Sequence, residues 1–511
     1  MMADEMSGIS QFLVNLLEIM SMFFIFIIGA LLLTVVIFYI IDIRQTTHSI
    51  RRNYPVIGRF RYFFENIGEF FRQYFFAMDR EELPFNRAER SWVYRAAKNV
   101  NNTVAFGSSR DLRPQGTVYF INCPFPTLDE DAITSRPRTI GEGCKYPYTT
   151  ASIFNISGMS YGALSKPAIL ALSNGARQAG CWMNTGEGGL SDYHLEGGAD
   201  IIFQIGTAKN GVRNLEGHLD DNKLREVAAH EQVKMFEIKL SQGAKPGKGG
   251  ILPAAKVSAE IARIRNIPEG QAAISPNRHP DINNNDHLLD MIAHIRDVTG
   301  KPVGFKAVLG NERWLEKLFT LIQQRGIDSA PDFITLDSAD GGTGAAPMSL
   351  IDNMGMPLRE SLPLLVDALT RHDLRDRVKI IASGKLVTPT GVAWALCMGA
   401  DYIVSARGFM FALGCIQALQ CNKNTCPTGI TTHDKKLQHG LVVGDKSVRV
   451  ANYVRNMVYE VGVIAHSCGV KEPNELSRRH ARVVVENGRS MSLAELYPDV
   501  VVAHKNTSPI N

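Results

Sequence analysis

The sequence predicts an α/β protein that folds as a (β/α)8, or TIM, barrel, preceded by an N-terminal transmembrane helix and a helical pre-barrel segment. Three observations predict this fold class. Eight short apolar runs alternate with helical patterns between residues 151 and 440, polar and glycine-rich sequences follow most of these runs, and an uncharged run of 23 residues lies near the N-terminus. Alternating strands and helices indicate a parallel sheet, and eight such units close a barrel. An open doubly wound sheet is the alternative.

The composition is that of an ordinary globular protein. Of the 511 residues, 45% are hydrophobic and 21% are charged, which excludes disordered, collagen-like and disulfide-scaffold proteins. The net charge of +4 gives no indication of a nucleic-acid partner. The eight cysteines include three within twelve residues. That density favours a metal or a cluster in a reducing compartment over secreted disulfides.

Residues 1–18 form an N-terminal tail, and residues 19–41 form the predicted transmembrane helix. The run carries no charge and would extend about 34 Å as a helix, enough for a bilayer core of about 30 Å. A buried core helix seldom lacks a polar face over this length. A cleaved signal peptide fits poorly, because Asp4, Glu5 and Glu18 precede the run and no small-residue cleavage site follows it.

Residues 42–83 form a basic and aromatic juxtamembrane segment. No acidic residue occurs between Asp42 and Glu65, so the positive-inside rule predicts a single-pass membrane protein with its catalytic domain in the cytoplasm. Aromatic residues recur at helical spacing within residues 59–78. We expect either an amphipathic helix on the membrane surface or a helix docked on the catalytic domain. The arginines between the two acidic residues are Arg44, Arg51, Arg52, Arg59 and Arg61.

The pre-barrel segment, 84–150, leads into the barrel at 151–440, and a helical segment, 441–511, ends the chain. Helical patterns such as Leu164–Gln178 and Thr390–Met398 separate the apolar runs. Residues 241–300 are too long for a simple crossover, so we expect a functional insertion there. The predicted strands are Ile153–Ser157, Cys181–Thr185, Ile201–Ile205, Met235–Leu240, Val303–Val308, Phe333–Asp337, Ile380–Ser383 and Tyr402–Ala406.

In such a barrel the chemistry lies at the carboxyl ends of the strands. Gly384, Arg407 and Gly408, after the seventh and eighth strands, predict a phosphate site there. Lys306 lies inside the apolar pattern GFKAV. It predicts either a salt bridge in the barrel mouth or a cation beside a flavin ring, and the shared mouth favours the flavin. The sequence GGTGAA at 341–346 lacks the glycine spacing of a dinucleotide-binding fingerprint.

Cys415, Cys421 and Cys426 give the spacing C-x5-C-x4-C, followed by Pro427. Thiolates this close predict metal ligands, and a terminal Cys-Pro is frequent in iron–sulfur loops. Three cysteines favour a three-iron cluster over a four-iron cluster. Zinc with His433 as a fourth ligand and three unligated buried cysteines are the alternatives.

At this point the chain resembles the FMN-binding synthase domain of glutamate synthase, in particular its stand-alone, membrane-anchored relatives. The resemblance runs from about residue 84 to residue 500. It rests on ISGMSYGALS, NTGEGG, EIKLSQGAKPGKGG, ISPNRHPDI, GGTGAAP and CIQALQCNKNTCPTGI, in this order. It implies a TIM barrel with FMN and a 3Fe–4S cluster, in which ammonia and 2-oxoglutarate form an imine that a flavin hydride reduces to L-glutamate.

The resemblance also implies roles for particular residues. Cys415, Cys421 and Cys426 would ligate the cluster, and Glu187 and Lys245 would bind substrate or move protons. Lys209 stands where the full-length enzymes commonly have an arginine for a substrate carboxylate, and lysine lacks the bidentate fork of arginine. The expected FMN contacts are Ser157, Gly158, Met159, Ser160, Lys306, Ser338, Gly341, Gly342, Gly344, Ser383, Gly384, Lys385, Arg407 and Gly408.

Two further features bear on the reaction. Ser338-Ala339 stands where the full-length enzymes usually have Gly-His, which removes an imidazole near the flavin. The chain opens Met1-Met2 without the cysteine nucleophile of amidotransferases and has no NAD(P)H fingerprint. We therefore expect ammonia from solution or from a separate subunit, and electrons from an external donor such as ferredoxin, a reductase subunit or a membrane carrier.

Three functions compete. The first is an oxidoreductase acting on the CH–NH2 group, a glutamate synthase in which electrons pass from the donor through the cluster to FMN and Glu187 protonates nitrogen. The second is an FMN enzyme with another 2-oxo, 2-hydroxy or amino acid substrate, which Lys209 and Ala339 favour. The third is a membrane-held electron-transfer subunit without turnover.

Overall fold

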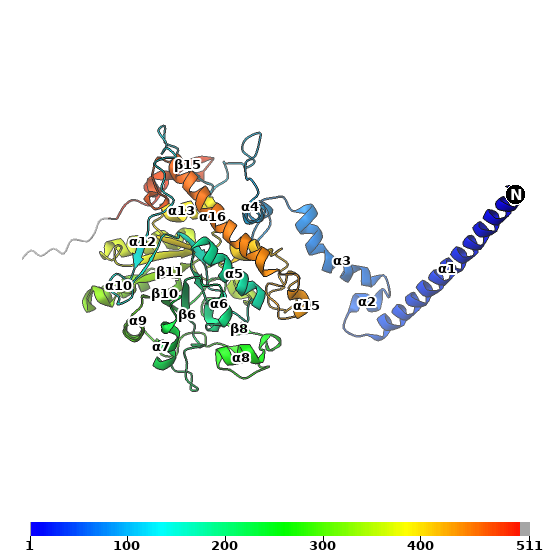
Figure 1. Ribbon diagram of the computed structural model, residues 1–511, viewed down its shortest axis with the longest axis horizontal. Helices are drawn as coiled ribbons and strands as arrows, with labels where there is room; N and C mark the ends of the chain where they lie inside the picture. The colour runs from blue at the N-terminus through cyan, green and yellow to red at the C-terminus, as the bar shows by residue number, and fades with distance from the viewer. Residues whose placement is uncertain (1, 501–511) are drawn as a thin grey trace, which may run out of the picture. The chain divides into compact units, whose positions relative to one another are not determined.

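The computed structural model describes residues 2–500, and the chain divides into two compact units, residues 1–88 and 89–511. The first unit is helical. It consists of α1 (Met2–Arg44), α2 (Ser49–Asn53), α3 (Gly58–Phe71) and a π-helical turn, η1 (Arg72–Phe76). The second unit holds all the strands (Figure 1).

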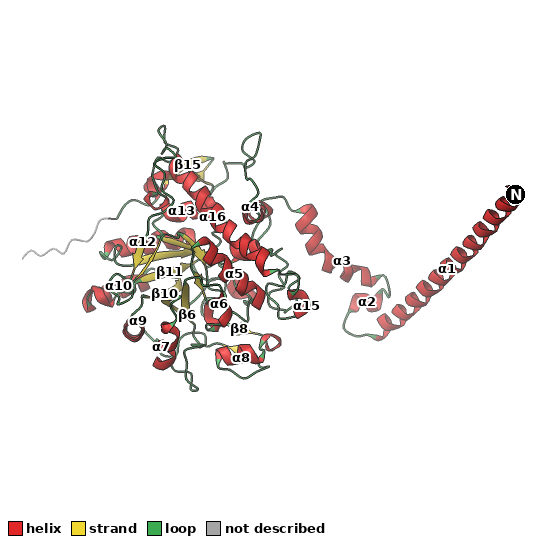
Figure 2. Cartoon of the chain, in the orientation of Figure 1, coloured by secondary structure: helices red, strands yellow, loops and turns green. Residues whose placement is uncertain are grey.

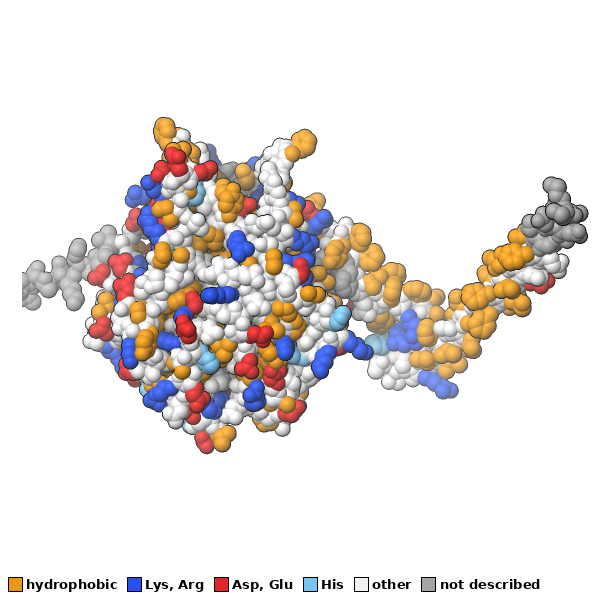
Figure 3. Space-filling model, viewed as in Figure 1, with side chains coloured by type: hydrophobic (Ala, Val, Ile, Leu, Met, Phe, Trp, Pro, Cys, Tyr) orange, Lys and Arg blue, Asp and Glu red, His pale blue; other side chains and the backbone are white. Residues whose placement is uncertain are grey.

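Helix α1 contains the predicted span. Gln11–Arg44 is long and apolar enough to cross a membrane, and this candidate rests on length and composition alone. None of its most apolar window is buried against other parts of the chain. The space-filling view shows hydrophobic side chains along α1 and again along α3 (Figure 3).

The second unit is built on a closed barrel of eight parallel strands, which confirms the predicted fold class. Each strand falls on one of the eight apolar runs. The chain order is kept around the barrel, and β13 closes it on β4 with Ile403 opposite Phe154. The strands are β4 (Phe154–Ile156), β5 (Met183–Asn184), β6 (Ile201–Ile205), β7 (Val233–Lys239), β10 (Val303–Val308), β11 (Phe333–Asp337), β12 (Lys379–Ser383) and β13 (Tyr402–Ser405).

Helices surround the strands (Figure 2). The residues at the ends of the first helix, α5 (Lys166–Ala179), explain where it begins and ends. Ser165 caps its start by accepting from the Ala168 N–H, and Gly180 ends it in a left-handed conformation. The other helices of this layer are α6 (Asp192–Glu196), α7 (Asp221–Ala229), α9 (Asn285–Thr299), α10 (Arg313–Arg325), α12 (Leu358–Arg371), α13 (Pro389–Cys397), α14 (Arg407–Leu413) and α16 (Val443–Ser467), with α5 at Lys166–Ala179.

A hairpin closes one end of the barrel. Strands β2 (Arg138–Ile140) and β3 (Tyr148–Thr150) pair with each other. Ile140 and Tyr148 belong to one buried cluster with Trp182, Tyr402 and other residues at the amino ends of the barrel strands. Because this end is filled with apolar side chains, the carboxyl ends form the mouth that is available for chemistry.

The expected insertion at 241–300 contains a two-stranded sheet of β8 (Ile251–Leu252) and β9 (Ala273–Ile274), helix α8 (Ala259–Arg265) and then α9. The segments that flank the barrel also contain strands. Strand β1 (Val118–Phe120) precedes the barrel and pairs with β14 (Ala481–Glu486), which pairs with β15 (Arg489–Ser492). Helix α4 (Arg87–Ala97) precedes this sheet, and α17 (Leu493–Leu496) follows it.

Candidate active site at the carboxyl ends of the strands

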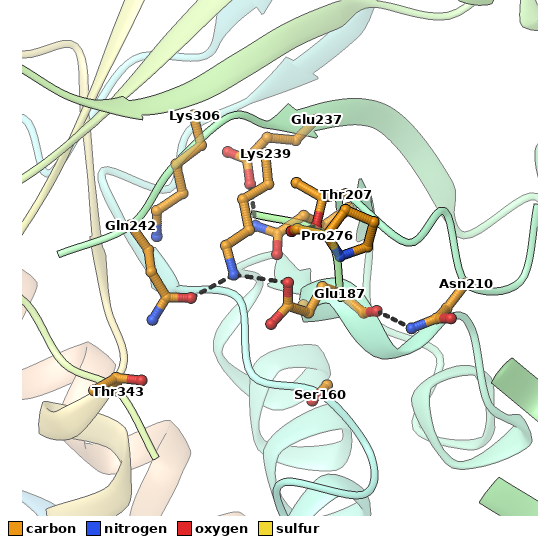
Figure 4. Close-up of polar contacts among 12 residues, drawn as sticks. Ser160, Glu187, Thr207, Asn210, Glu237, Lys239, Gln242, Pro276, Lys306 and Thr343 are labelled. Carbon is orange, nitrogen blue, oxygen red and sulfur yellow. Dashed lines mark hydrogen bonds and ion pairs between the residues drawn. The ribbon is translucent and has the colours of Figure 1, made fainter. Parts of the chain in front are cut away.

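Lys239 lies at the centre of the polar groups in the barrel mouth. It ends β7, and its ammonium lies 3.0 Å from Glu187 Oε2, on the turn after β5. It also donates to Gln242, whose amide donates to the Gly342 carbonyl at 3.2 Å. Figure 4 shows the Lys239 ammonium between Gln242 and Glu187. These contacts bring the loops after β5, β7 and β11 together.

Glu187 is held as a carboxylate. Burial alone would raise the pKa of its carboxyl group, but Lys239, Lys245 and Arg265 together hold this pKa below its ordinary value. The side chain fits closely between two backbone segments, because a Cβ at Gly206 would lie 2.6 Å from Glu187 Cβ. Glycine is therefore required next to this carboxylate.

Two buried cations near Glu187 are not neutralised by direct ion pairs. The Lys245 side chain is largely buried, and its ammonium forms no hydrogen bond or ion pair within the described part of the chain. Its pKa is lowered by burial, with Glu187 opposing the shift. Arg265, at the end of α8, donates to the Tyr161 carbonyl at 3.1 Å and contacts Ser160 Oγ at 3.4 Å, while its buried Nε has no partner among the described residues. Both cations suit an anionic ligand.

Lys306 forms the salt bridge that the sequence suggested as one interpretation. Its ammonium lies 3.2 Å from Asp337 Oδ2, and Asp337 also accepts from Ser383 Oγ at 2.8 Å and from the Gly243 N–H at 3.0 Å. Burial opposes the charge of Lys306, but Asp337 and Glu237 keep its pKa above the ordinary value. Lys306 is opposite Lys239 in the β10–β7 register, so two ammonium groups share one level of the mouth.

Glu237 lies deeper in the barrel. One carboxylate oxygen accepts from Asn184 Nδ2 at 2.9 Å and from Gln204 Nε2 at 2.7 Å, and the other accepts from Thr335 Oγ1. Every donor is itself buried. This network positions the floor of the mouth, where Glu237 adds a negative charge below Lys306.

Arg407, the cation predicted for a phosphate, and Lys385, an expected FMN contact, both contact Asp340. Lys385 Nζ lies 3.0 Å from its carboxylate, and Arg407 Nη2 donates to its backbone carbonyl at 3.1 Å. Ser338 Oγ also donates to the Asp340 carboxylate. Gly384, with a φ of +132°, packs against Ser338, and a Cβ at Gly342 would lie 2.9 Å from Arg407 Nε. Gly408 packs on Tyr453, whereas Gly344 faces open space.

The residues after β4 line the opposite side of the mouth. Ser157 donates its N–H to the Ser405 carbonyl at 3.0 Å, which joins the loops after β4 and β13. Gly158 lies against Asn184 and Gln204, since a Cβ there would be 2.9 Å from Asn184 Oδ1. Met159 and Ser160 are buried next in the chain. The structure thus gathers these residues around the same mouth as Glu187 and Lys306.

Lys209 is paired elsewhere. Its ammonium lies 2.5 Å from Asp281 Oδ2, in the insertion, and its side chain is 1% exposed. The nearby His279 donates through Nε2 to the Lys239 carbonyl at 3.0 Å, while its buried Nδ1 has no partner among the described residues. Lys209 therefore braces the insertion in this structure, and its predicted contact with substrate stays a prediction.

The three predicted cluster ligands lie in one loop after α14. Burial raises the pKa of the Cys415 thiol to about 12. Cys426 Sγ lies 3.3 Å from Thr428 Oγ1, and Lys256 donates to the Cys421 carbonyl at 2.9 Å. Within residues 2–500, no three His, Cys, Asp or Glu side chains are close enough together to hold a metal ion. His433, the alternative zinc ligand, instead contacts the Gly162 carbonyl at 2.8 Å.

Sequence reasoning passed over Lys239, Gln242 and Arg265. Lys239 carried a usable signal: VKMFEIK places a lysine and a glutamate inside an apolar strand, the same pattern that singled out Lys306. Arg265 carried none, because a basic residue in the last turn of a helix is ordinary on the surface. Only the folding of the insertion over the mouth buries it.

The fold and the mouth define the class: a parallel (β/α)8 barrel with a buried, charged site at the carboxyl ends of its strands. The conserved region in glutamate synthase matches residues 129–471. A glutamate synthase large subunit-like protein of Bacillus subtilis, YerD, is 41% identical over 513 residues, covering 92% of this chain and 97% of that protein. The chain belongs to the glutamate synthase family, as the sequence motifs predicted.

More distant relatives differ in length. The archaeal glutamate synthase [NADPH] of Methanocaldococcus jannaschii is 32% identical over 339 residues, which cover 64% of this chain and 61% of that protein. The match thus spans about three fifths of that enzyme. Among solved structures, a mandelate oxidase bound to (S)-4-hydroxymandelic acid is similar, with 15% identity, a TM-score of 0.46 and coverage of 78% of this chain and 99% of that one.

Proposed function

We propose that the protein is an FMN- and iron–sulfur-dependent oxidoreductase that converts 2-oxoglutarate and ammonia to L-glutamate. The observation that carries this proposal is the pairing of Lys239 with Glu187 beside two buried cations that have no carboxylate in contact. A 2-oxo diacid supplies two carboxylates and a carbonyl, which matches two cations and a proton donor. The names of the relatives support the same reaction.

Arg265 and Lys245 would bind the substrate carboxylates. The buried Nε of Arg265 has no partner among the described residues, and the Lys245 ammonium forms no hydrogen bond or ion pair with them. Lys209 is less suited to this role, because a substrate would have to displace Asp281 from it. The buried, paired charges around the site would keep both carboxylates fixed and exclude water.

Lys239 and Glu187 would move protons. The lowered pKa of Glu187 keeps it ionised, so it is better suited to accept a proton from ammonium than to act as the acid. Lys239, in contact with that carboxylate, would donate a proton to the carbonyl oxygen as it leaves during imine formation. Gln242 would hold the Lys239 ammonium in place through its hydrogen bond.

The chain offers a donor set that fits FMN. When bound, FMN would supply the hydride that reduces the imine. Lys306 would face the electron-rich part of the ring, and Lys385 and Arg407, which both contact Asp340 after β11, would bind the phosphate. The open space at Gly344 leaves room on this side of the mouth.

The cluster, the membrane location and the partners belong to the same proposal. The 3Fe–4S cluster rests on the spacing of Cys415, Cys421 and Cys426 and needs a rearrangement of their loop, since these thiols form no metal-binding group within residues 2–500. Helix α1 would anchor the protein with its barrel in the cytoplasm. An external donor, such as ferredoxin or a reductase subunit, would supply electrons, and ammonia would come from solution or a separate subunit.

The test is turnover with a chemically reduced donor, ammonium and 2-oxoglutarate, measured as glutamate formed by anaerobically purified protein. Flavin, iron and sulfide are assayed in the same sample. Lys239→Met should lower kcat about 100-fold or more, as expected for loss of a positioned proton donor. Lys234→Met, on the same strand but paired with Asp200, is the matched control. Turnover of another 2-oxo acid in place of 2-oxoglutarate would support the alternative substrate class instead.

A further inference from the structure

A buried carboxylate joins the end of α1 to the start of α3. Asp42 is fully buried and accepts from Arg51 Nε at 2.9 Å and Nη2 at 2.7 Å, from the Val56 N–H at 3.0 Å and from Arg59 Nε at 2.8 Å. Both oxygens are therefore satisfied by groups from three points along the following 17 residues. A carboxylate used in this way fixes a turn, because removing it leaves two guanidinium groups and an amide without their acceptor.

Other contacts close the same turn. The Arg59 guanidinium lies 3.9 Å from the centre of the Phe38 ring on α1. Gln45 holds the backbone of His48 from both sides, accepting from its N–H at 2.7 Å and donating to its carbonyl at 2.8 Å. Gly58 permits the close approach, since a Cβ there would lie 2.8 Å from the Ile50 carbonyl oxygen. Residues 42–59 therefore form a defined turn, which we call the Asp42 turn.

The turn leads into a helix with one exposed aromatic face. Phe63 and Phe64 lie three and four residues after Phe60 on α3, and Phe71 lies seven residues after Phe64. Each of these four side chains is 47–61% exposed. Tyr74, Phe75 and Phe76 continue this exposure into η1. Tyr62 lies on the opposite face, with its ring centre 4.8 Å from that of His48. Large aromatic side chains exposed this densely mark a surface that a membrane or another protein covers.

The charge around the turn favours phospholipid as that cover. Asp42 engages Arg51 and Arg59, so these two arginines serve the turn. Arg44, Arg52 and Arg61 have no acidic partner among the residues whose side chains the structure describes. They lie between an apolar span and an aromatic helix, where cationic groups meet anionic headgroups and aromatic rings lie at the acyl boundary. Continuity with α1 places this segment at the surface of one leaflet.

We propose that residues 42–76 form an interfacial anchor, in which the Asp42 turn lays α3 and η1 along the anionic leaflet from which α1 emerges. The aromatic face enters the acyl boundary, and Arg44, Arg52 and Arg61 contact lipid phosphates. The anchor requires that α1 span the membrane, and it is independent of the reaction that the barrel performs.

The full chain is tested in vesicles of phosphatidylcholine and phosphatidylglycerol. The photoreactive residue p-benzoylphenylalanine replaces Phe64 in one variant and Tyr62, on the opposite face of α3, in the control. After irradiation, intact-mass analysis should show lipid adducts at position 64 and far fewer at position 62. A crosslink from position 64 to the same chain or to a second copy would overturn the proposal, as would the absence of any adduct there.

The turn is tested by Asp42→Ala in the chain that carries the photoreactive residue at position 64. Lipid adducts should fall several-fold while the protein stays in the membrane after carbonate extraction. Asp79→Ala, at an exposed ion pair, is the matched control. Gly58→Val opens the same turn without removing a charge and should act like Asp42→Ala. Unchanged adducts in both turn variants would overturn the role of the turn, and release by carbonate from the unsubstituted chain would overturn the span on which it depends.

Discussion

At the scale of single residues, the barrel mouth holds more cations than carboxylates. Lys239, Lys245, Arg265 and Lys306 carry four positive charges against the three carboxylates of Glu187, Glu237 and Asp337. Buried charges without direct partners cost stability, so they persist where a ligand uses them. Lys245 is the clearest case, because its ammonium forms no hydrogen bond and has no carboxylate within 4.0 Å among the described residues.

Substrate binding should therefore depend on the charge of Lys245. Burial lowers the pKa of this ammonium below its ordinary value. An anionic substrate binds the charged form, so kcat/KM should be highest below this lowered pKa and fall as pH rises through it. Lys245→Arg should move this alkaline limb upward, since arginine stays protonated. Lys245→Met should remove the limb and lower kcat/KM about tenfold or more, through loss of a charge-assisted contact.

The pH profile of kcat/KM in 2-oxoglutarate measures this effect. Lys248→Met, in the same loop but exposed, should leave the profile as it is in the unsubstituted chain. An alkaline limb that persists unchanged in Lys245→Met would assign it to another group and remove Lys245 from the binding site.

The sequence indicates single residues where they break a local pattern. Lys306 interrupts an apolar strand, and Glu187 and Lys245 lie in glycine-rich motifs, so each could be selected before the fold was known. The pairing of Lys209 with Asp281 joins positions more than 70 residues apart and has no local signature. The same holds for Arg265, which becomes part of the mouth only when the insertion folds over it.

At the scale of elements, the barrel strands were predictable because parallel strands are buried on both faces. Such strands appear as continuous apolar runs, and Ile201–Ile205, Val303–Val308 and Phe333–Asp337 match the structure at both ends. β5 is shorter than its apolar run. The β1–β14 pair could not be predicted, because it joins Val118 to Val483 and depends on how the flanking segments meet.

The contact between the loops after β7 and β11 depends on Gly243, because a side chain at this position would clash. Gly243 donates its N–H to Asp337 at 3.0 Å, and a Cβ there would clash with the Ser338 carbonyl and lie 2.6 Å from Gly341 Cα. Gly243→Ala should push the loops after β7 and β11 apart and destabilise the fold by about 1–3 kcal/mol, the usual cost of overpacking. Thermal unfolding measures the loss, and flavin content measures the effect on the mouth.

Gly143→Ala is the matched control for this substitution. Gly143 is exposed, and a Cβ there meets no atom within 4 Å, so its unfolding temperature should stay close to that of the unsubstituted chain. Equal unfolding temperatures for Gly243→Ala and Gly143→Ala would show that the loops tolerate separation and that their contact does not support the mouth.

At the scale of the whole molecule, the candidate membrane span and the barrel come from separate parts of the chain. The barrel strands and the buried cluster that closes their amino ends all come from residues after 137, whereas the candidate span ends at Arg44. The sequence predicted both parts, because each has its own hydrophobic pattern: one long uninterrupted run, and eight short periodic ones. How the two units are arranged is not encoded in either pattern.

This separation predicts that the barrel folds without its anchor. A chain that lacks residues 2–78 should stay in the soluble fraction without detergent, because it loses α1 and the exposed aromatic face of α3. Its unfolding temperature should stay within about 3 °C of that of the full chain, a shift that corresponds to about 3 kcal/mol in a domain of this size. Fractionation, thermal unfolding in one detergent and flavin content measure the three properties. A shortened chain that pellets or unfolds at a much lower temperature would mean that the first unit stabilises the barrel. Attachment and catalysis would then be coupled through the fold.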